Sequence, residues 1–176
     1  GWADTYPAVA KHAFTFLFNQ AEFGMGCPIN VTDGAARLLS RFGDDALKAK
    51  YLDGLTQTDM EKLTQGGQFM TEKEGGSDVG KLTTTAVQDG DHWRLYGEKW
   101  FCSNADAKMV MLLARPEGAV GGTQGVGLFL MPRELDDGSP NHYRIVRLKD
   151  KLGTRSMASG EIKLEGAIAY AVGRLD

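Results

Sequence analysis

Two short stretches of this sequence combine residue types that could bind a ligand. In the first, residues 69–79, Gly75 and Gly76 are followed by Ser77 and Asp78. Glycine allows a backbone to approach a ligand closely, and successive N–H groups in such a turn can hold an anion such as a pyrophosphate. A turn capped by its own side chains accounts for the same residues, so their chemistry alone leaves both interpretations open.

The second stretch, residues 99–104, places Trp100 and Phe101 next to each other on a predicted strand. Because neighbouring strand residues point to opposite faces, one aromatic ring could join the core while the other covers a flat ligand. Ser103 follows Phe101 by two positions and therefore shares its face, opposite Cys102. The stretch thus offers an aromatic plane and a hydroxyl side by side.

The glycine-rich segment 118–127 does not predict a nucleotide site. A dinucleotide-binding loop joins a strand to the N-terminus of a helix, so that backbone N–H groups face the phosphates. Here strands are expected on both sides of the segment, which favours a mobile hairpin loop.

No metal centre or cysteine framework is predicted either. His12, His92 and His142 are isolated, and none lies at the spacing of a metal-ligand set. Cys27 and Cys102 are too few for a disulfide framework. A Gly-x-Ser-x-Gly motif is lacking, although spacing alone does not exclude a catalytic triad, because the fold assembles it.

The composition is that of an ordinary globular protein, since 42% of the 176 residues are hydrophobic and 24% are charged. The net charge of −3 argues against nucleic-acid binding, which needs a basic face. No segment holds the roughly 18 consecutive apolar residues of a membrane span, and a cytoplasmic location is expected. The lack of an initiator Met and of a signal pattern suggests a piece of a longer protein.

Three helices are expected in the first 65 residues. The first has a cap at Asp4 or Thr5 and Pro7 in its first turn. Its apolar residues occupy more than one side, which suggests burial between neighbouring elements; they include Phe14, Phe16, Leu17, Phe18 and Phe23. Three residues are expected to end it: Gly24, Gly26 and Pro28. A second helix is expected at 30–42, and a third begins at Asp44.

From Gln68 onward the hydrophobic period changes to two, which is typical of strands. Six further strands are expected at residues 82–88, 92–102, 108–115, 127–132, 143–148 and 160–164. Short strands without helices between them are typical of an antiparallel barrel or sandwich. The fold class is therefore α+β, with a helical segment at residues 1–65 and a β-domain at 66–176.

Three motifs have the order and spacing found in one known family. They are Thr71-Glu72 with Gly76-Ser77-Asp78, then Phe101-Cys102-Ser103-Asn104, then residues 151–159. With them the chain resembles the acyl-CoA dehydrogenases. Residues 1–65 resemble the end of the family's N-terminal helical domain and the remainder its middle β-domain, so the C-terminal helical domain is expected beyond this chain. The sequences of residues 70–79, 148–153 and 167–173 are most similar to those of the alkylation-response (AidB-like) branch.

The resemblance implies flavin chemistry. Family members bind FAD and convert an acyl-CoA to its 2,3-enoyl form: a glutamate removes the α-proton and a hydride passes to flavin N5. An electron-transfer flavoprotein or another acceptor reoxidises the flavin, and the proteins are homo-oligomers. Because the catalytic glutamate comes from the C-terminal domain, no catalytic residue is expected here, and the isolated chain should be inactive. Three other carboxylates are expected to be solvated or turn-stabilising: Glu72, Glu74 and Glu98.

The resemblance also assigns cofactor contacts to the first stretch. The strand from Gln68 through Met70 to Thr71 would run beside the flavin, with Thr71 bonded to its pyrimidine edge. Gly76 and Ser77 would meet the pyrophosphate, and Ser77 would also border the acyl-CoA channel.

In the second stretch, Phe101 stands where the family often has Trp and would stack on the isoalloxazine ring. Ser103 stands where many members have Thr and would hydrogen-bond near flavin O4 and N5, with Cys102 between the two contacts. The protein's part in such chemistry is positioning and electrostatics.

Two alternatives remain open. The AidB-like branch is tied to alkylation damage and contacts DNA through a basic C-terminal region, and this chain at −3 offers no such surface. A non-catalytic β-domain could also serve as an assembly module with a degenerate flavin site. The retained Thr71, Ser77 and Ser103 argue against that second alternative.

Overall fold

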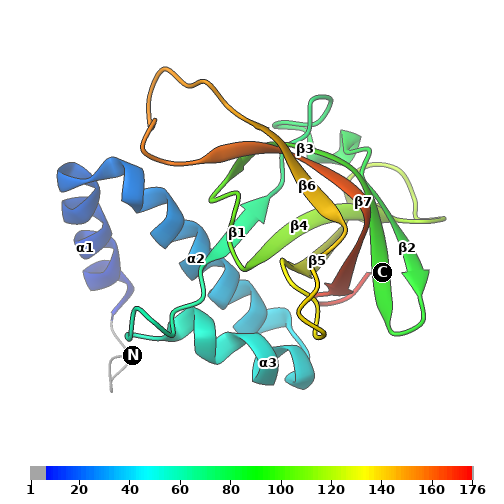
Figure 1. Ribbon diagram of the computed structural model, residues 1–176, viewed down its shortest axis with the longest axis horizontal. Coiled ribbons are helices and arrows are strands. Elements are labelled where there is room, and N and C mark those ends of the chain that lie inside the picture. Colours follow the sequence, from blue (N-terminus) through cyan, green and yellow to red (C-terminus); the bar gives the residue numbers. More distant parts are fainter. Residues whose placement is uncertain (1–6, 176) are drawn as a thin grey trace.

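The structure is a computed structural model that describes residues 7–175, and within that range it has three α-helices followed by seven strands (Figure 1). The helices are α1 (Ala8–Ala21), α2 (Phe23–Phe42) and α3 (Asp45–Thr56). The strands are β1 (Gly66–Phe69), β2 (Thr85–Asp89), β3 (His92–Ser103), β4 (Met109–Pro116), β5 (Gly127–Pro132), β6 (Tyr143–Leu148) and β7 (Ser159–Ala171). The α+β fold class is confirmed. The predicted caps Asp4 and Thr5 lie outside the described residues.

The expected break at residues 24–28 is wrong, because α2 begins at Phe23 and contains Pro28. The two glycines serve close packing instead. A side-chain carbon at Gly24 would overlap Ser156 of the loop between β6 and β7, and one at Gly26 would overlap Asn19 of α1. Contacts with Ser156 and Asn19 therefore leave little room for a side chain at either position. By contrast, the cap expected at Asp44 forms, since its carboxylate accepts from Leu47 N–H at 2.8 Å.

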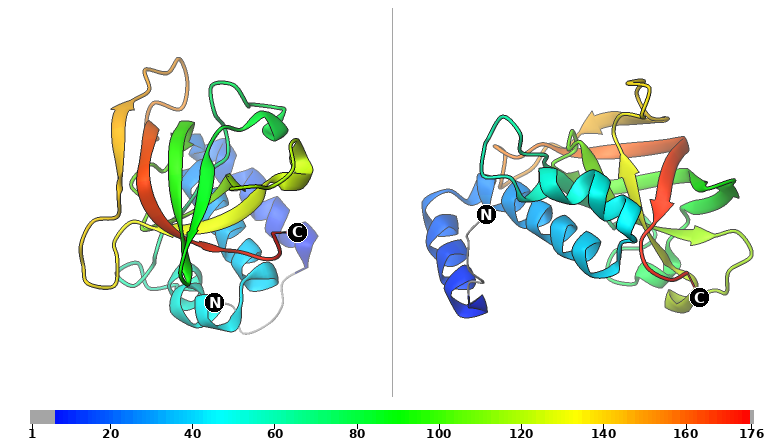
Figure 2. Two further views of the ribbon diagram at one scale, coloured as in Figure 1. Left: turned by 90° about the vertical axis from the view of Figure 1, so that its right-hand side faces the viewer. Right: turned by 90° about the horizontal axis from the view of Figure 1, so that it is seen from below.

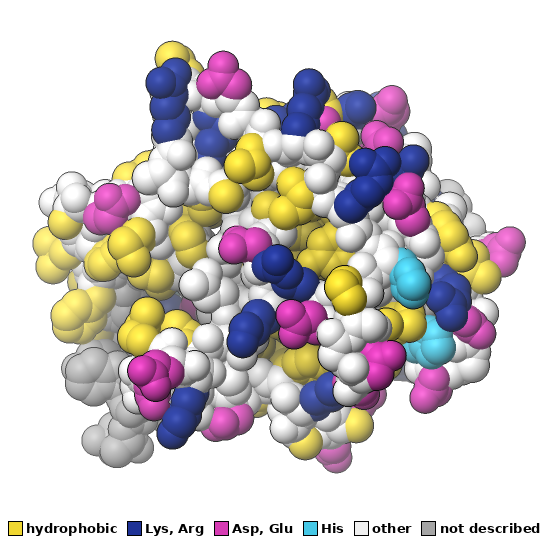
Figure 3. Space-filling model, in the orientation of Figure 1, with side chains coloured by type: hydrophobic (Ala, Val, Ile, Leu, Met, Phe, Trp, Pro, Cys, Tyr) yellow, Lys and Arg dark blue, Asp and Glu magenta, His cyan; other side chains and the backbone are white. Residues whose placement is uncertain are grey.

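Helix α1 is not buried between neighbours as its apolar composition suggested. No described side chain of α1 is buried, and its exposed hydrophobic residues include Val9, Phe14, Phe16, Leu17 and Phe18. Hydrophobic side chains gather over α1 at the left of the space-filling view in Figure 3. The helix thus presents an apolar surface.

The strands close into a barrel. Neighbouring strands follow the order β4-β2-β3-β7-β5, and β5 pairs again with β4. Strand β1 joins the edge of β4, and β6 pairs with β7. Most pairings are antiparallel as expected, but β4 runs parallel to both β1 and β2. Within residues 7–175, no α-helix lies between these strands, and only two short 3₁₀ turns, at residues 79–81 and 123–125, interrupt their loops.

Two hydrophobic cores share strand β4. Val110 and Leu112 point into the barrel, whereas Met109 and Met111 point toward the helices. Figure 2 shows α2 and α3 side by side along one side of the β-domain. Since both faces of β4 are covered, its residues are buried almost without interruption. The helices thereby hold β1 and β4, and with them the chain that leads to residue 71.

Candidate functional site

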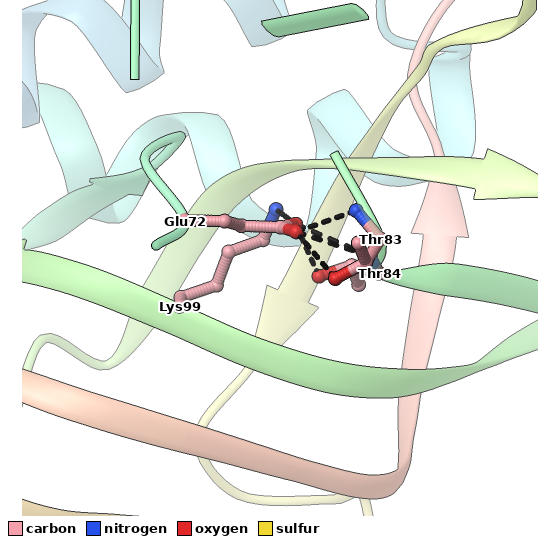
Figure 4. Close-up of polar contacts among 4 residues, drawn as sticks. All are labelled: Glu72, Thr83, Thr84 and Lys99. Atoms are coloured by element: carbon pink, nitrogen blue, oxygen red, sulfur yellow. Dashed lines mark hydrogen bonds and ion pairs between the residues drawn. The ribbon is translucent and has the colours of Figure 1, made fainter. Parts of the chain in front are cut away.

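A buried ion pair fixes the first stretch to strand β3. Lys99 Nζ donates to Glu72 Oε1 at 2.6 Å, and the two side chains are 0% and 2% exposed. The carboxylate also accepts hydrogen bonds from the backbone N–H and the hydroxyl of both Thr83 and Thr84 (Figure 4). Glu72 is therefore not solvated: it is a buried carboxylate that closes the loop between residues 72 and 84.

Burial and hydrogen bonding act in opposite directions on this pair. Burial raises the pKa of the Glu72 carboxyl, but the hydrogen bonds from Lys99 and Thr84 outweigh it and hold that pKa below its ordinary value. For Lys99 burial dominates, and it lowers the pKa of the ammonium group despite the adjacent carboxylate. Each group depends on the other, because removing one leaves the other buried without a counter-charge.

A backbone hydrogen bond brings Thr71 beside the second stretch: Trp100 N–H donates to Thr71 O at 2.8 Å. Beyond Thr71 the chain turns, and Gly76 and Ser77 are exposed. A side-chain carbon at Gly76 would meet no atom within 4 Å. The turn therefore has open space in which a ligand could approach the backbone.

Gln68 and Met70, the other predicted residues of this strand, are half-buried. Gln68 lies in β1 with its amide against Gly34 of α2, and Met70 packs against the core beside the helices. Both side chains thus hold the strand in place on the helical side.

A β-bulge interrupts the alternation expected for β3. Pairing with β7 shifts by one residue between Lys99 and Cys102, so two residues of β3 oppose one of β7. Phe101 adopts a left-handed φ of 55° and is 55% exposed, while Trp100 is half-buried. The expectation that one ring joins the core is wrong, because the bulge directs Lys99 and Cys102 inward instead.

Cys102 and Ser103 differ sharply in accessibility. Burial raises the pKa of the Cys102 thiol to about 12, and its side chain lies in the barrel core. A side-chain contact from Cys102 to a cofactor is therefore excluded by geometry, which leaves only its backbone. Ser103 is half-buried, and its hydroxyl lies 3.1 Å from that of Ser159 on β7.

The side chains that surround these two stretches were not predicted from the sequence. Lys151 Nζ donates to Ser159 Oγ at 3.1 Å. Lys149 Nζ lies 2.7 Å from the centre of the Trp100 ring and 2.8 Å from Glu161 Oε1. Lys151 begins the third motif, and Lys149 lies two residues before it. The motif could therefore have drawn attention to both lysines, but only the fold shows which residues they contact.

The glycine-rich segment lies between β4 and β5, as expected for a hairpin loop. Arg115 holds it in place by donating to Val120 O at 2.5 Å and to Gly122 O at 3.1 Å. The same guanidinium donates to Gly80 O at 2.8 Å, so this loop and the loop of residues 72–84 are tied together.

Within residues 7–175, no helix has the length and apolar character needed to cross a membrane. In the same range, no three or more His, Cys, Asp or Glu side chains gather where they could hold a metal ion.

Comparison with known proteins gives a consistent result. Residues 67–167 match the family described as "Acyl-CoA dehydrogenase, middle domain". The chain is 41% identical over 167 residues to "Acyl-CoA dehydrogenase family member 11" of Caenorhabditis elegans, covering 90% of this chain and 27% of that protein. It is 39% identical over 179 residues to "Putative acyl-CoA dehydrogenase AidB" of Escherichia coli, covering 94% of this chain and 31% of that protein.

A solved structure agrees with the sequence relatives. The crystal structure of Caenorhabditis elegans ACDH-11 in complex with C11-CoA superimposes with a TM-score of 0.78 at 42% identity, over 84% of this chain and 26% of that chain. This chain thus spans less than a third of the length of these relatives. The matched domain, the relatives and the shared fold together show that the chain belongs to the acyl-CoA dehydrogenase family.

Proposed function

We propose that this chain is the FAD-binding central part of a cytoplasmic flavoenzyme that carries out α,β-dehydrogenation of acyl-CoA thioesters. One observation carries the proposal: the exposed ring of Phe101 and the hydroxyl of Ser103 occur just after Trp100, whose N–H is bonded to Thr71 O at 2.8 Å. An aromatic plane and polar groups from β3 and from the chain just after β1 are thus offered together. A planar heteroaromatic cofactor fits such a set of groups.

The residues present fit FAD. The Phe101 ring would cover the isoalloxazine, while Ser103 and Thr71 would hydrogen-bond its polar edges. Gly76 and Ser77 would offer backbone N–H groups to the pyrophosphate, where the structure leaves open space. When bound, FAD would supply the acceptor for the hydride that dehydrogenation removes.

The substrate class follows from the family and from ACDH-11, whose structure holds C11-CoA. Ser77 is proposed to border the acyl-CoA channel as well as the pyrophosphate. An electron-transfer flavoprotein or another acceptor would take the electrons onward.

We also propose that a C-terminal helical domain of a longer parent supplies the catalytic glutamate and covers the apolar surface of α1. The relatives are more than three times as long as the matched region. Homo-oligomerisation of the parent is part of this proposal. Apolar surfaces of this kind promote association.

Because the catalytic glutamate is proposed to lie outside this chain, the chain purified alone should show no turnover with FAD, acyl-CoA and an electron-accepting dye. Turnover would refute the proposal that another domain supplies the catalytic glutamate.

The proposed function is tested by titrating the purified chain with FAD and recording visible difference spectra. Binding is expected to be weak, since part of the site lies elsewhere while the ordering costs remain. A saturable shift of the flavin bands that disappears in Phe101→Ala, and that needs about tenfold more FAD in Ser103→Ala, would support it. A spectrum that never shifts, or that shifts equally in the variants, would contradict it.

An AidB-like role in the alkylation response is the second candidate, favoured by 39% identity over nearly the whole chain. It predicts that the parent binds DNA through a region outside this chain. This chain, with a net charge of −3, should itself leave duplex DNA unshifted in a gel assay at physiological salt. A third candidate, a non-catalytic assembly module, predicts that the purified parent carries no flavin.

A further inference from the structure

Three side chains form a hydrogen-bonded chain that ends at the proposed cofactor site. Ser103 and Ser159 face each other in the β3–β7 register, and their hydroxyl oxygens lie 3.1 Å apart. Lys151, in the loop before β7, places its Nζ 3.1 Å from Ser159 Oγ. A second bond from Lys151 Nζ, to Met157 O at 2.5 Å, fixes the ammonium group in place.

The chemistry of lysine sets the direction of this chain. An ammonium group can only donate, so the Ser159 oxygen is the acceptor of the first bond. The Ser159 hydroxyl is buried, and its own proton needs an acceptor. Within residues 7–175, the one partner recorded for that proton is Ser103 Oγ. This assigns Ser159 as the donor and Ser103 as the acceptor, and it leaves the Ser103 proton for a partner other than Ser159.

We propose that Lys151 is a positioning residue: acting through Ser159, it holds the Ser103 hydroxyl as an outward hydrogen-bond donor. The site then favours a ring that presents an acceptor, such as a carbonyl oxygen or an unprotonated ring nitrogen. This inference rests on the proposed function, because it names the property that would let Ser103 recognise the oxidised flavin ring. A serine without such a partner could rotate and accept instead.

The first test needs no cofactor. In the purified chain, NMR of the hydroxyl protons should show a Ser159 proton protected from exchange and a Ser103 proton that exchanges rapidly with water. Lys151→Met keeps the aliphatic stem but removes the donor, and it should abolish the protection at Ser159. Ser159→Thr keeps a hydroxyl at position 159, so the proton of that hydroxyl should remain protected from exchange. The reverse order, with Ser103 protected and Ser159 exchanging, would overturn the inference whether or not the chain takes up FAD.

The second test is a double-mutant cycle on FAD affinity, measured by titration with visible difference spectra. Lys151→Met and Ser103→Ala should each weaken binding about tenfold, the worth of one good hydrogen bond. The double variant should lose no more than either single variant, because Lys151 acts through Ser103. Losses that multiply to about a hundredfold would show that Lys151 acts independently and would refute the positioning role.

Controls separate this role from general damage. Lys163→Met removes a lysine from β7, the strand that carries Ser159, and the Lys163 side chain pairs with Glu165. FAD affinity should stay within about twofold of the unmodified chain. Thermal unfolding of every variant checks that the fold is retained. If the unmodified chain binds no FAD at all, the proposed function fails for this chain, and the hydroxyl exchange alone decides the positioning role.

Discussion

Lys99 Nζ lies 2.6 Å from Glu72 Oε1, and neither side chain is exposed by more than 2%. The pair joins residues 27 positions apart, so it ties the loop of the first stretch to the strand that carries the second. A nearby pair, Lys73 and Glu98, has the same charges but is 3.5 Å apart and more than half exposed. The two pairs therefore offer a matched comparison of a buried and a surface ion pair on the same two segments.

Glu72→Gln should lower the free energy of unfolding by about 3 kcal/mol, because it leaves the Lys99 ammonium buried without a counter-charge. Urea denaturation of the purified chain measures this. Glu98→Gln is the control and should change stability by less than about 1 kcal/mol, as expected for an exposed pair. The Glu72→Gln, Lys99→Met double variant should lose less than the sum of its single variants. Equal decreases in the free energy of unfolding for Glu72→Gln and Glu98→Gln would show that the buried pair stabilises the fold no more than the exposed pair.

The same carboxylate should make stability fall in acid. The pKa of Glu72 is lowered in the folded chain relative to its ordinary value of 4.5, so its contribution is complete above about pH 4.5. It is lost as the pH falls from that value through the folded pKa. Unfolding free energies measured from about pH 6 down to about pH 3 should fall less steeply for Glu72→Gln than for the unmodified chain. Parallel curves would contradict this.

Cys102 should be chemically inert while the chain is folded. Its thiol is buried and has a pKa of about 12, so almost no thiolate forms near neutral pH. Iodoacetamide at about pH 8 should label half-buried Cys27 in the native chain and label Cys102 only after unfolding in denaturant. A Cys27→Ser chain that reacts at the native Cys27 rate would show that Cys102 is accessible.

Phe101 allows stability and cofactor binding to be separated. Phe101→Gly removes a largely exposed ring and relieves a left-handed φ of 55°, while it adds chain entropy to the unfolded state. These effects nearly offset each other, so the unfolding free energy should change by less than about 1 kcal/mol. The flavin difference spectrum should nevertheless disappear, and Phe101→Trp should retain it. A normal spectrum for Phe101→Gly would mean that the ring does not cover the flavin.

Features that depend on neighbours in the sequence were predictable. The cap at Asp44 formed because a carboxylate at that position reaches an N–H only three residues away. The strand expected at residues 108–115 is β4, although it is buried on both faces rather than on alternate residues. The α+β class followed from the switch of hydrophobic period after residue 65.

Features that depend on distant partners were not predictable from local patterns. Gly24 and Gly26 have the composition of a helix end, but their roles are set by Ser156 and Asn19. No local pattern marks Lys99 as buried, and only the fold places Glu72 beside it. In the candidate site, motif residues such as Ser103 could be identified from the sequence. Their hydrogen-bond partners, such as Ser159, could be identified only from the structure.

The bulge in β3 lets this strand carry one more aromatic side chain than regular pairing with β7 would allow. Lys99 and Cys102 both point inward although three positions separate them, and this is compatible with a strand only because one extra residue is accommodated. Deleting Trp100 or Phe101 would leave Lys99 and Cys102 two positions apart, so a regular strand would keep both side chains inward without a bulge. Such a deletion would spare the buried Lys99 and Cys102 and would cost the strand one of its two adjacent aromatic side chains.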